Sequence, residues 1–175
     1  MKVKNRFAIV APLLFFLSCI YVFCNVLVSP GKRTEKESYK IELLHSDRIY
    51  KKIESSDLLV LIGNVRMKQG DMYLFCDSAY YYELSNSFEA FGEVRMRQSD
   101  TLSLRSKYMY YDGTSQLMKA RQNVILTHRK VNLYTDSLNY DKLYEIGYFF
   151  EGGKLVDNGN VLVSDWGQYS LTSKD

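Results

Sequence analysis

The chain has 175 residues, of which 46% are hydrophobic, 14% aromatic and 25% charged; this balance is typical of a folded globular domain and excludes a chain that is disordered throughout. The formal net charge is +3, and Lys2, Lys4 and Arg6 near the amino terminus account for the whole excess of basic residues. The rest of the chain is neutral, which argues against a nucleic acid as partner.

Residues 1–30 predict a signal peptide or a membrane anchor. A basic start precedes the apolar run FAIVAPLLFFLSCIYVFCNVLV at residues 7–28, and about 20 apolar residues are enough to cross a bilayer. Because no small-residue cleavage site closes the run, an uncleaved anchor with its basic end in the cytoplasm is favoured over a cleaved signal peptide. FLSC, ending at Cys19, resembles a lipoprotein box, but the apolar residues after it do not suit an acylated terminus. Residues 31–40 are charged and aperiodic and predict a tether.

Residues 41–175 predict one domain that is built from a repeat. A phrase of a small residue or Gln, then Asn or Glu, Val, any residue and an apolar residue occurs as Gly63-Asn64-Val65-x-Met67, Gly92-Glu93-Val94-x-Met96, Gln122-Asn123-Val124-x-Leu126 and Gly159-Asn160-Val161-x-Val163. The copies are 29, 30 and 37 residues apart. Repetition at a period of this length marks stacked supersecondary units.

A second phrase alternates with the first along the chain. It appears as LFCDSAYYY at 74–82, LRSKYMYYD at 104–112 and LYTDSLNYD at 133–141, with a fainter forerunner, LLHSDRIYK, at 43–51. Each repeat unit is therefore expected to supply two short strands, and the forerunner half a unit.

Both phrases alternate apolar and polar residues, which is the pattern of a strand with one buried face. Val94 and Met96 alternate with Arg95 and Arg97, so a slip of one residue would bury two arginines, and the register is expected to be fixed. No proline occurs after Pro30, as suits a backbone that lies mostly in β ladders. We therefore expect an all-β fold of roughly eight to eleven short antiparallel strands, doubled over into two facing sheets with one apolar interior.

Glycines and turn residues mark the bends of this fold. Gly63, Gly92 and Gly159 recur just before the alternation, where a backbone bend or bulge needs a residue without a Cβ atom. Stretches such as KQGD, LSNS, YDGTSQ and DNGN have the composition of turns and lie between the expected strands. EGGKL also reads as a turn.

Residues that could carry chemistry are few. His45 and His128 lie in non-equivalent phrases and are expected to be structural, and Cys76 is expected to be a small buried side chain without a disulfide partner. The recurring acidic residues are Asp47, Asp77 and Asp136. Calcium sites are one interpretation of them, but the Gly-Asp-rich nonapeptide is absent, and turn formation at strand ends is favoured. No nucleophile, metal-protease or phosphate-loop motif occurs, so neither enzyme activity nor a metal or cofactor is expected.

These repeats resemble the OstA-like, organic-solvent-tolerance family of lipopolysaccharide-transport proteins, in particular the form found in Bacteroidota. Tandem GNV-type strands, the L-x-x-D-x-h-x-Y phrases and the stretch at 135–169 carry the resemblance, which covers roughly residues 40–170. It implies an open β-jellyroll, folded like a taco, whose apolar groove holds the acyl chains of lipopolysaccharide in the periplasm and whose edges join copies or similar transport proteins head to tail. The apolar segment would make this chain a component tethered to the inner membrane, and the end at LTSKD suggests a shortened member.

Under this resemblance the apolar residues of one parity line the lipid groove. They are Leu59, Leu61, Val65, Met67, Leu74, Val94, Met96, Leu104, Val124, Leu126, Leu133, Val161 and Val163. A dry sandwich core would need the same parity, and a structural or adhesive repeat protein that assembles through strand edges is the alternative function. The basic residues between them, Arg66, Lys68, Arg95 and Arg97, are expected to form a solvated outer face.

Overall fold

The computed structural model describes residues 40–52 and 57–172, all within one compact unit, Lys36–Asp175. These residues form twelve strands in a single sheet whose pairs are all antiparallel. No helix in this described part of the chain is long and apolar enough to cross a membrane. The apolar helix predicted at residues 7–28 and nearly all of the tether lie outside the described residues, so both remain predictions.

The strands follow the two sequence phrases closely. They are β1 (Glu42–His45), β2 (Arg48–Lys51), β3 (Leu58–Gln69), β4 (Met72–Tyr82), β5 (Ser87–Gln98), β6 (Leu102–Asp112), β7 (Leu117–His128), β8 (Val131–Asp141), β9 (Ile146–Phe149), β10 (Gly153–Asp157), β11 (Asn160–Ser164) and β12 (Gly167–Ser170). The expected turns at KQGD, LSNS, YDGTSQ and DNGN are confirmed. The six central strands are 11 or 12 residues long, so the prediction of short strands was wrong.

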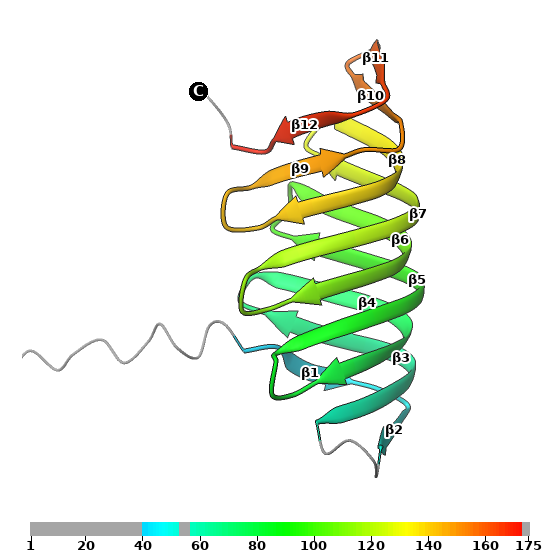
Figure 1. Cartoon of the computed structure of the whole chain (residues 1–175), viewed down its shortest axis with the longest axis vertical. Helices are drawn as coiled ribbons and strands as arrows, with labels where there is room; N and C mark the ends of the chain where they lie inside the picture. Colours follow the sequence, from blue (N-terminus) through cyan, green and yellow to red (C-terminus); the bar gives the residue numbers. More distant parts are fainter. Residues whose placement is uncertain (1–39, 53–56, 173–175) are drawn as a thin grey trace, which may run out of the picture. The chain divides into compact units, whose positions relative to one another are not determined.

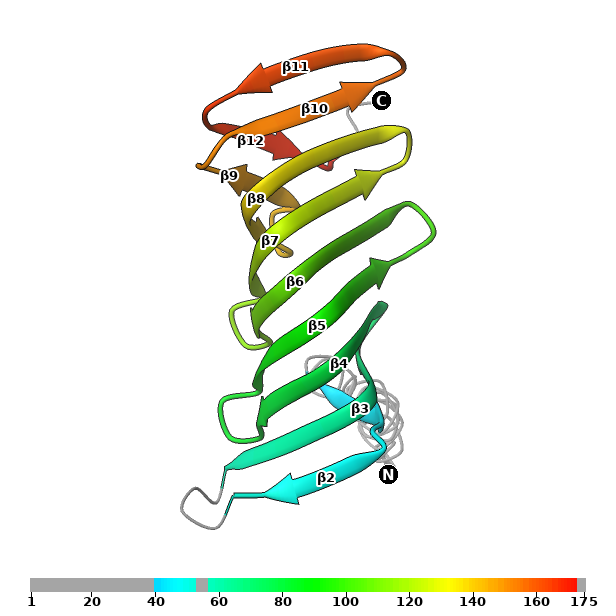
Figure 2. The same ribbon diagram turned by 90° about the vertical axis from the view of Figure 1, so that its right-hand side faces the viewer.

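Each long strand bends near its middle and contributes to two layers, as Figures 1 and 2 show for the stack from β3 to β8. The register shifts at this bend in every central pair, for example between Phe91 and Val94 where β5 pairs with β6. We call the line of bends the crease and the opposite line of strand ends the lip. Two short strands replace one long strand at each end: β2 and β1 pair with the two halves of β3, and β9 and β10 with the two halves of β8.

The two layers are defined by the halves of the strands. Layer A contains β2, β9, β12 and residues 58–62, 78–82, 87–91, 108–112, 117–121 and 137–141; layer B contains β1, β10, β11 and residues 65–69, 72–76, 94–98, 102–106, 124–128 and 131–135. The end strands do not pair with one another in the described residues, so the hydrogen-bonded sheet stays open. The all-β, doubled-over fold predicted from the repeat and the open jellyroll implied by the family resemblance are thus confirmed.

The crease is made by an aspartate that packs against a glycine of the next long strand. Gly92 has φ +95°, and a Cβ atom there would lie 2.1 Å from Oδ2 of Asp77. The same oxygen accepts a hydrogen bond of 3.1 Å from the backbone N–H of Glu93. At the preceding bend Gly63, φ +81°, meets Asp47 in the same way. Glycine is required because both its positive φ and the aspartate exclude a side chain.

Two sequence expectations about these residues need correction. Gly159, with φ +90°, lies in the β10–β11 turn and not at a bend of a long strand. Asp77 and Asp136 lie at the crease within long strands and not at strand ends: Asp136 accepts the backbone N–H of Asn123 there at 3.1 Å. Asp47, between β1 and β2, lies at a strand end as expected. The strands are longer than expected, and so the place where one strand seemed to end is the middle of a bent strand.

One inward row of layer B shows how the register builds the core. Its members lie directly opposite one another across nine strands: Leu43, Met67, Leu74, Met96, Leu104, Leu126, Leu133, Leu155 and Leu162. The six from Met67 to Leu133 are buried to 1% exposure or less and belong to the single hydrophobic cluster formed by both layers. Burial of each such side chain stabilises the fold by about 1.5–3 kcal/mol.

The crease contact predicts a specific cost for one glycine substitution. Gly92→Ala adds a Cβ atom against Asp77 as well as the strain of a positive φ, whereas Gly159→Ala adds the strain alone, because nothing lies within 4 Å of its position. We expect Gly159→Ala to lower the free energy of unfolding by about 1–2 kcal/mol and Gly92→Ala to lower it by roughly 2 kcal/mol more. Urea unfolding followed by circular dichroism measures both; equal losses would contradict the proposed role of the aspartate.

Candidate functional site

The predicted groove residues lie between the two layers in most cases. Ten are buried in the common cluster: Leu61, Val65, Met67, Leu74, Val94, Met96, Leu104, Val124, Leu126 and Leu133. Leu59 is partly buried and packs against them. The alternation in the two phrases therefore brings these side chains, from six strands, into one continuous apolar interior.

The last two predicted groove residues have the wrong parity. Leu155 lies opposite the buried Leu133 and opposite Leu162, so Leu162 is the inward residue of β11. Val161 and Val163, its neighbours on each side, point to the outer face and are 57% and 72% exposed. The sequence phrase at 159–163 matches the other copies but lies in a hairpin at the edge of the sheet. Relative to the other copies its register is shifted by one residue, and such a shift moves every side chain to the opposite face.

The apolar interior continues to both ends of the stack. At one end Ile49 on β2 lies opposite Leu61 and is 53% exposed; at the other end Leu162 on β11 is 63% exposed. Each of these residues belongs to the last strand of its layer, so no further strand among the described residues covers its free side. The interior is therefore apolar along its whole length and uncovered at its two ends.

The lip is closed by hydrogen bonds between the layers. The hydroxyl of Tyr81 donates to the carbonyl oxygen of Ile41 at 3.0 Å. The hydroxyl of Tyr111 donates to Oε1 of Gln69, a side chain of 1% exposure whose Nε2 also donates to the Gly113 carbonyl at 3.1 Å.

Two further contacts cross the lip. Nδ1 of His128 lies 3.2 Å from the hydroxyl of Tyr169, and Nζ of Lys142 lies 3.4 Å from Oδ1 of Asp71. Side chains of both layers thus meet along the lip and fill the interior behind it.

The tyrosine contacts form a ladder with one rung for each repeat. Its tyrosines are Tyr81, Tyr111, Tyr140 and Tyr169, and the groups that face them across the lip are Ile41, Gln69, Gln98 and His128, each 40–42 residues earlier in the chain. In the third rung, Oε1 of Gln98 and the hydroxyl of Tyr140 are buried without a hydrogen-bond partner among the described residues. Both residues line a cavity of about 220 Å³ at the lip.

Sequence reasoning missed this ladder, although its signal was present. Gln69 and Gln98 follow the two most similar copies of the first phrase by two residues, and Tyr81, Tyr111 and Tyr140 are the next-to-last residues of the copies of the second phrase. The partners belong to different repeat units, so only the folding of the sheet at the crease brings them together. Burial raises the pKa of Tyr111 and of Tyr140 far above the ordinary tyrosine range, which keeps both hydroxyls protonated as donors.

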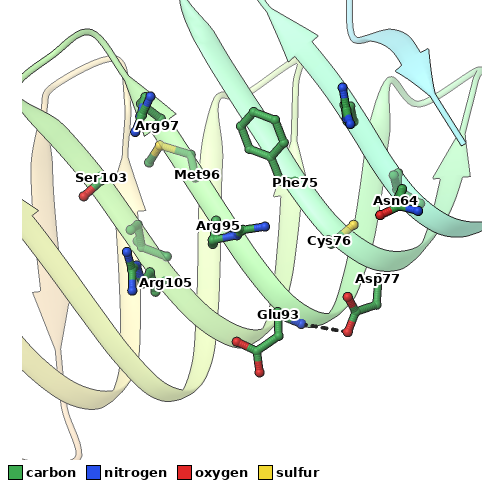
Figure 3. A pocket seen from close by; sticks show the side chains of 13 residues that line it. Asn64, Phe75, Cys76, Asp77, Glu93, Arg95, Met96, Arg97, Ser103 and Arg105 are labelled. Atoms are coloured by element: carbon green, nitrogen blue, oxygen red, sulfur yellow. Dashed lines mark hydrogen bonds between the residues drawn. The ribbon is translucent and has the colours of Figure 1, made fainter.

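A second candidate surface is a basic hollow on the outer face of layer B, near the crease. Its volume is about 390 Å³, and Arg66, Arg95, Arg97 and Arg105 line it together with Phe75. Figure 3 shows Arg95 and Arg97 on β5 and Arg105 on the neighbouring strand β6, with Asp77 and Glu93 on the side of the crease. The outward direction predicted for the basic residues is confirmed, and the hollow that they line was not predicted.

Like charges face each other directly in this hollow. Arg95 on β5 lies opposite Arg105 on β6, and pairs of this kind destabilise a sheet. One of the two carboxylates of the hollow, Glu93, is already paired with Lys107, whose hydrogen bond is the main reason that the pKa of Glu93 is lowered. The arrangement therefore favours binding of multivalent anions.

The remaining titratable groups do not form a metal site in the described part of the chain. No group of three or more His, Cys, Asp or Glu residues gathers there as metal ligands. Burial raises the pKa of the Cys76 thiol to about 12, so the thiol is protonated at neutral pH. His45 contacts Asp47 at 3.1 Å on the surface.

The open, folded-over sheet with a continuous apolar interior defines an open β-jellyroll. A family model described as OstA-like protein matches residues 38–175. The chain therefore belongs to the OstA-like family, a family of transport proteins, as its repeats predicted. A comparison with curated protein sequences gave no match.

The lip ladder predicts opposite outcomes for two equivalent tyrosines. Tyr111→Phe leaves the buried Oε1 of Gln69 without its hydroxyl donor and is expected to lower the free energy of unfolding by about 1–3 kcal/mol. Tyr140→Phe removes a hydroxyl that has no partner and is expected to change stability by about 0.5 kcal/mol or less, or to stabilise the fold. Paired thermal and urea unfolding of the two variants checks this difference. Equal losses would show that the third rung is bonded like the second.

The basic hollow predicts a stabilising substitution. Arg105→Gln removes the charge opposite Arg95 and is expected to raise the free energy of unfolding by about 0.2–1 kcal/mol at low salt. The gain should disappear in about 1 M salt, where the screening length is roughly 3 Å. Lys130→Gln, in the β7–β8 turn, is the control and should show no such gain. A stability loss in Arg105→Gln that persists in salt would contradict charge repulsion.

Proposed function

We propose that this chain is a periplasmic component of lipopolysaccharide transport to the outer membrane and that its interior holds lipopolysaccharide acyl chains. The apolar row from Leu43 to Leu162 is the observation that carries the proposal. A row that served only as a dry core would need no apolar residue at its uncovered ends, whereas a path for an acyl chain needs them there. Family membership supports the same reading.

The chemistry of the interior suits a hydrocarbon occupant. Each buried CH₂ group contributes about 0.8 kcal/mol, so a chain of about a dozen methylenes contributes on the order of 10 kcal/mol before the costs of binding. Burial alone can therefore hold the lipid, and no catalytic group is required.

The interior has a means of making room for that occupant. Methionine is unbranched and adapts its packing. The described interior contains Met67, Met72, Met96, Met109 and Met118, and these are all the methionines of the chain except Met1. We infer that they move aside when the lip parts and an acyl chain replaces contacts between the layers.

The uncovered ends also support the proposed head-to-tail contact with a second copy or a similar β-jellyroll. At the β11 end Leu162 is flanked by the exposed Val161, Val163 and Trp166. Open strand edges of this kind pair readily with another strand. Such pairing would join the apolar interiors of two units into one path. The same edges support the alternative, an exported structural or adhesive protein that assembles without lipid.

The apolar segment at residues 7–28 supports placing the chain at the inner membrane. Under this proposal the segment stays as an anchor and the tether at 31–40 holds the β unit on the periplasmic side. If the segment is a cleaved signal peptide, the β unit is released into the periplasm and the lipid-binding role is unchanged.

Photocrosslinking in cells tests the proposal on the full chain. A photoreactive residue at Leu155, which faces the interior and is only partly buried, should crosslink to lipopolysaccharide, as should probes at Val94 and Met96. The same residue at Lys154, which neighbours Leu155 and faces outward, is the matched control. A probe at Leu162 should give crosslinks to protein at the proposed edge contact.

The outcomes separate the two functions. Lipopolysaccharide adducts from Leu155 and not from Lys154 support transport. Protein adducts from Leu162 without lipid adducts from any interior position would favour the adhesive alternative, and equal lipid adducts from Leu155 and Lys154 would contradict an interior binding path.

A further inference from the structure

We propose that the lip cavity beside Gln98 and Tyr140 binds the amide linkage of an N-acylated amphiphile. This inference rests on the proposed function, because it states where the polar end of the interior's occupant lies. The cavity would hold the linkage at the lip while the acyl chain runs into the interior and the head group stays outside.

The first support is the break in an otherwise regular ladder. The other three rungs are closed within the protein, by Ile41, Gln69 and His128. At the third rung Tyr140 is 1% exposed, and its hydroxyl has no hydrogen-bond partner among the described residues. The buried Oε1 atom of Gln98 has no partner among them either. Buried polar atoms are nearly always hydrogen-bonded in native proteins. Two unpaired atoms at one cavity therefore indicate a partner from outside the described residues.

The unpaired atoms select the chemistry of that partner. The hydroxyl of Tyr140 can donate to a carbonyl oxygen, and Oε1 of Gln98 can only accept, so it requires an N–H or O–H group. A secondary amide offers both a carbonyl oxygen and an N–H. An ester offers the carbonyl alone and would leave Gln98 unpaired. The site should therefore favour amide-linked over ester-linked acyl chains.

The size and lining of the cavity agree with a linkage group. Its volume is about 220 Å³, which is more than a single water molecule needs. The buried side chains of Leu102 and Leu171 supply apolar wall, and Arg129 and Glu145 add charged groups. Leu102 and Tyr140 belong to the common hydrophobic cluster, so the cavity borders the interior directly.

Binding of two matched probes to the full-length chain tests the inference. The probes are N-methyldodecanamide and methyl dodecanoate, which carry the same acyl chain on an amide and on an ester and have no hydroxyl group that could donate to Gln98. We expect the amide probe to bind about fivefold more tightly, the effect of one additional hydrogen bond. Gln98→Met should abolish this preference. Tyr140→Phe should weaken both probes about fivefold without changing their ratio, because both carry the carbonyl.

Tyr111→Phe is the control, because its hydroxyl is engaged by Gln69, and it should leave the ratio of the two affinities unchanged. Equal affinities in the unsubstituted chain, or a preference that survives Gln98→Met, would overturn the inference while leaving the proposed function intact. If both substitutions shift the melting temperature and neither changes an affinity, the cavity holds only a bridging water, and the inference is wrong. Failure of the chain to bind either probe would count against the proposed function itself.

Discussion

The packing of an aspartate against a glycine at the crease is the constraint on which this structure depends. Asp77 occupies the space of a Cβ atom at Gly92 and accepts the backbone N–H of Glu93, and Asp47 meets Gly63 in the same way. Each contact bends a strand of 11 or 12 residues at the same level as its neighbours. Because the bends are in register, a single sheet folds into two layers with the same parity of side chains inside both.

The bend of β6 and β7 shows that a glycine is needed only where an aspartate packs against it. Lys107 takes the place that Asp77 has in the preceding unit, and its side chain is directed to Glu93. The corresponding position on β7 is Gln122, which keeps a positive φ of 65° without being glycine. Asp136 on β8 stabilises this bend by accepting a hydrogen bond from the backbone N–H of Asn123. The bend is thus preserved while the residues that make it change.

The crease and the lip contribute differently to function. The crease uses backbone geometry and is permanent, whereas the lip is held by separate side-chain hydrogen bonds such as that between Tyr111 and Gln69. Net contributions of about 0.5–1.5 kcal/mol are typical of such bonds, so the acyl-chain burial discussed above is large enough to offset several of them. A sheet that is hinged at one line and held by weak bonds at the other can admit a hydrocarbon chain sideways. At the Tyr140 rung no hydrogen bond of this kind joins the layers among the described residues.

The sequence by itself determined the repeat, the parity of the strands and the family, because these depend on neighbours along one strand and on a period of about 29 residues. Val94 and Met96 alternate with Arg95 and Arg97, and a slip of one residue would expose the first pair and bury the second. Only the tertiary structure decided how far each strand runs, which side of β11 faces inward and which groups meet across the lip. These features depend on contacts between residues of different repeat units, 40–42 positions apart in the chain. They also depend on a bend that places the two halves of one strand in different layers. A local pattern contains no information about such contacts, since the same alternation describes two short strands or one bent strand.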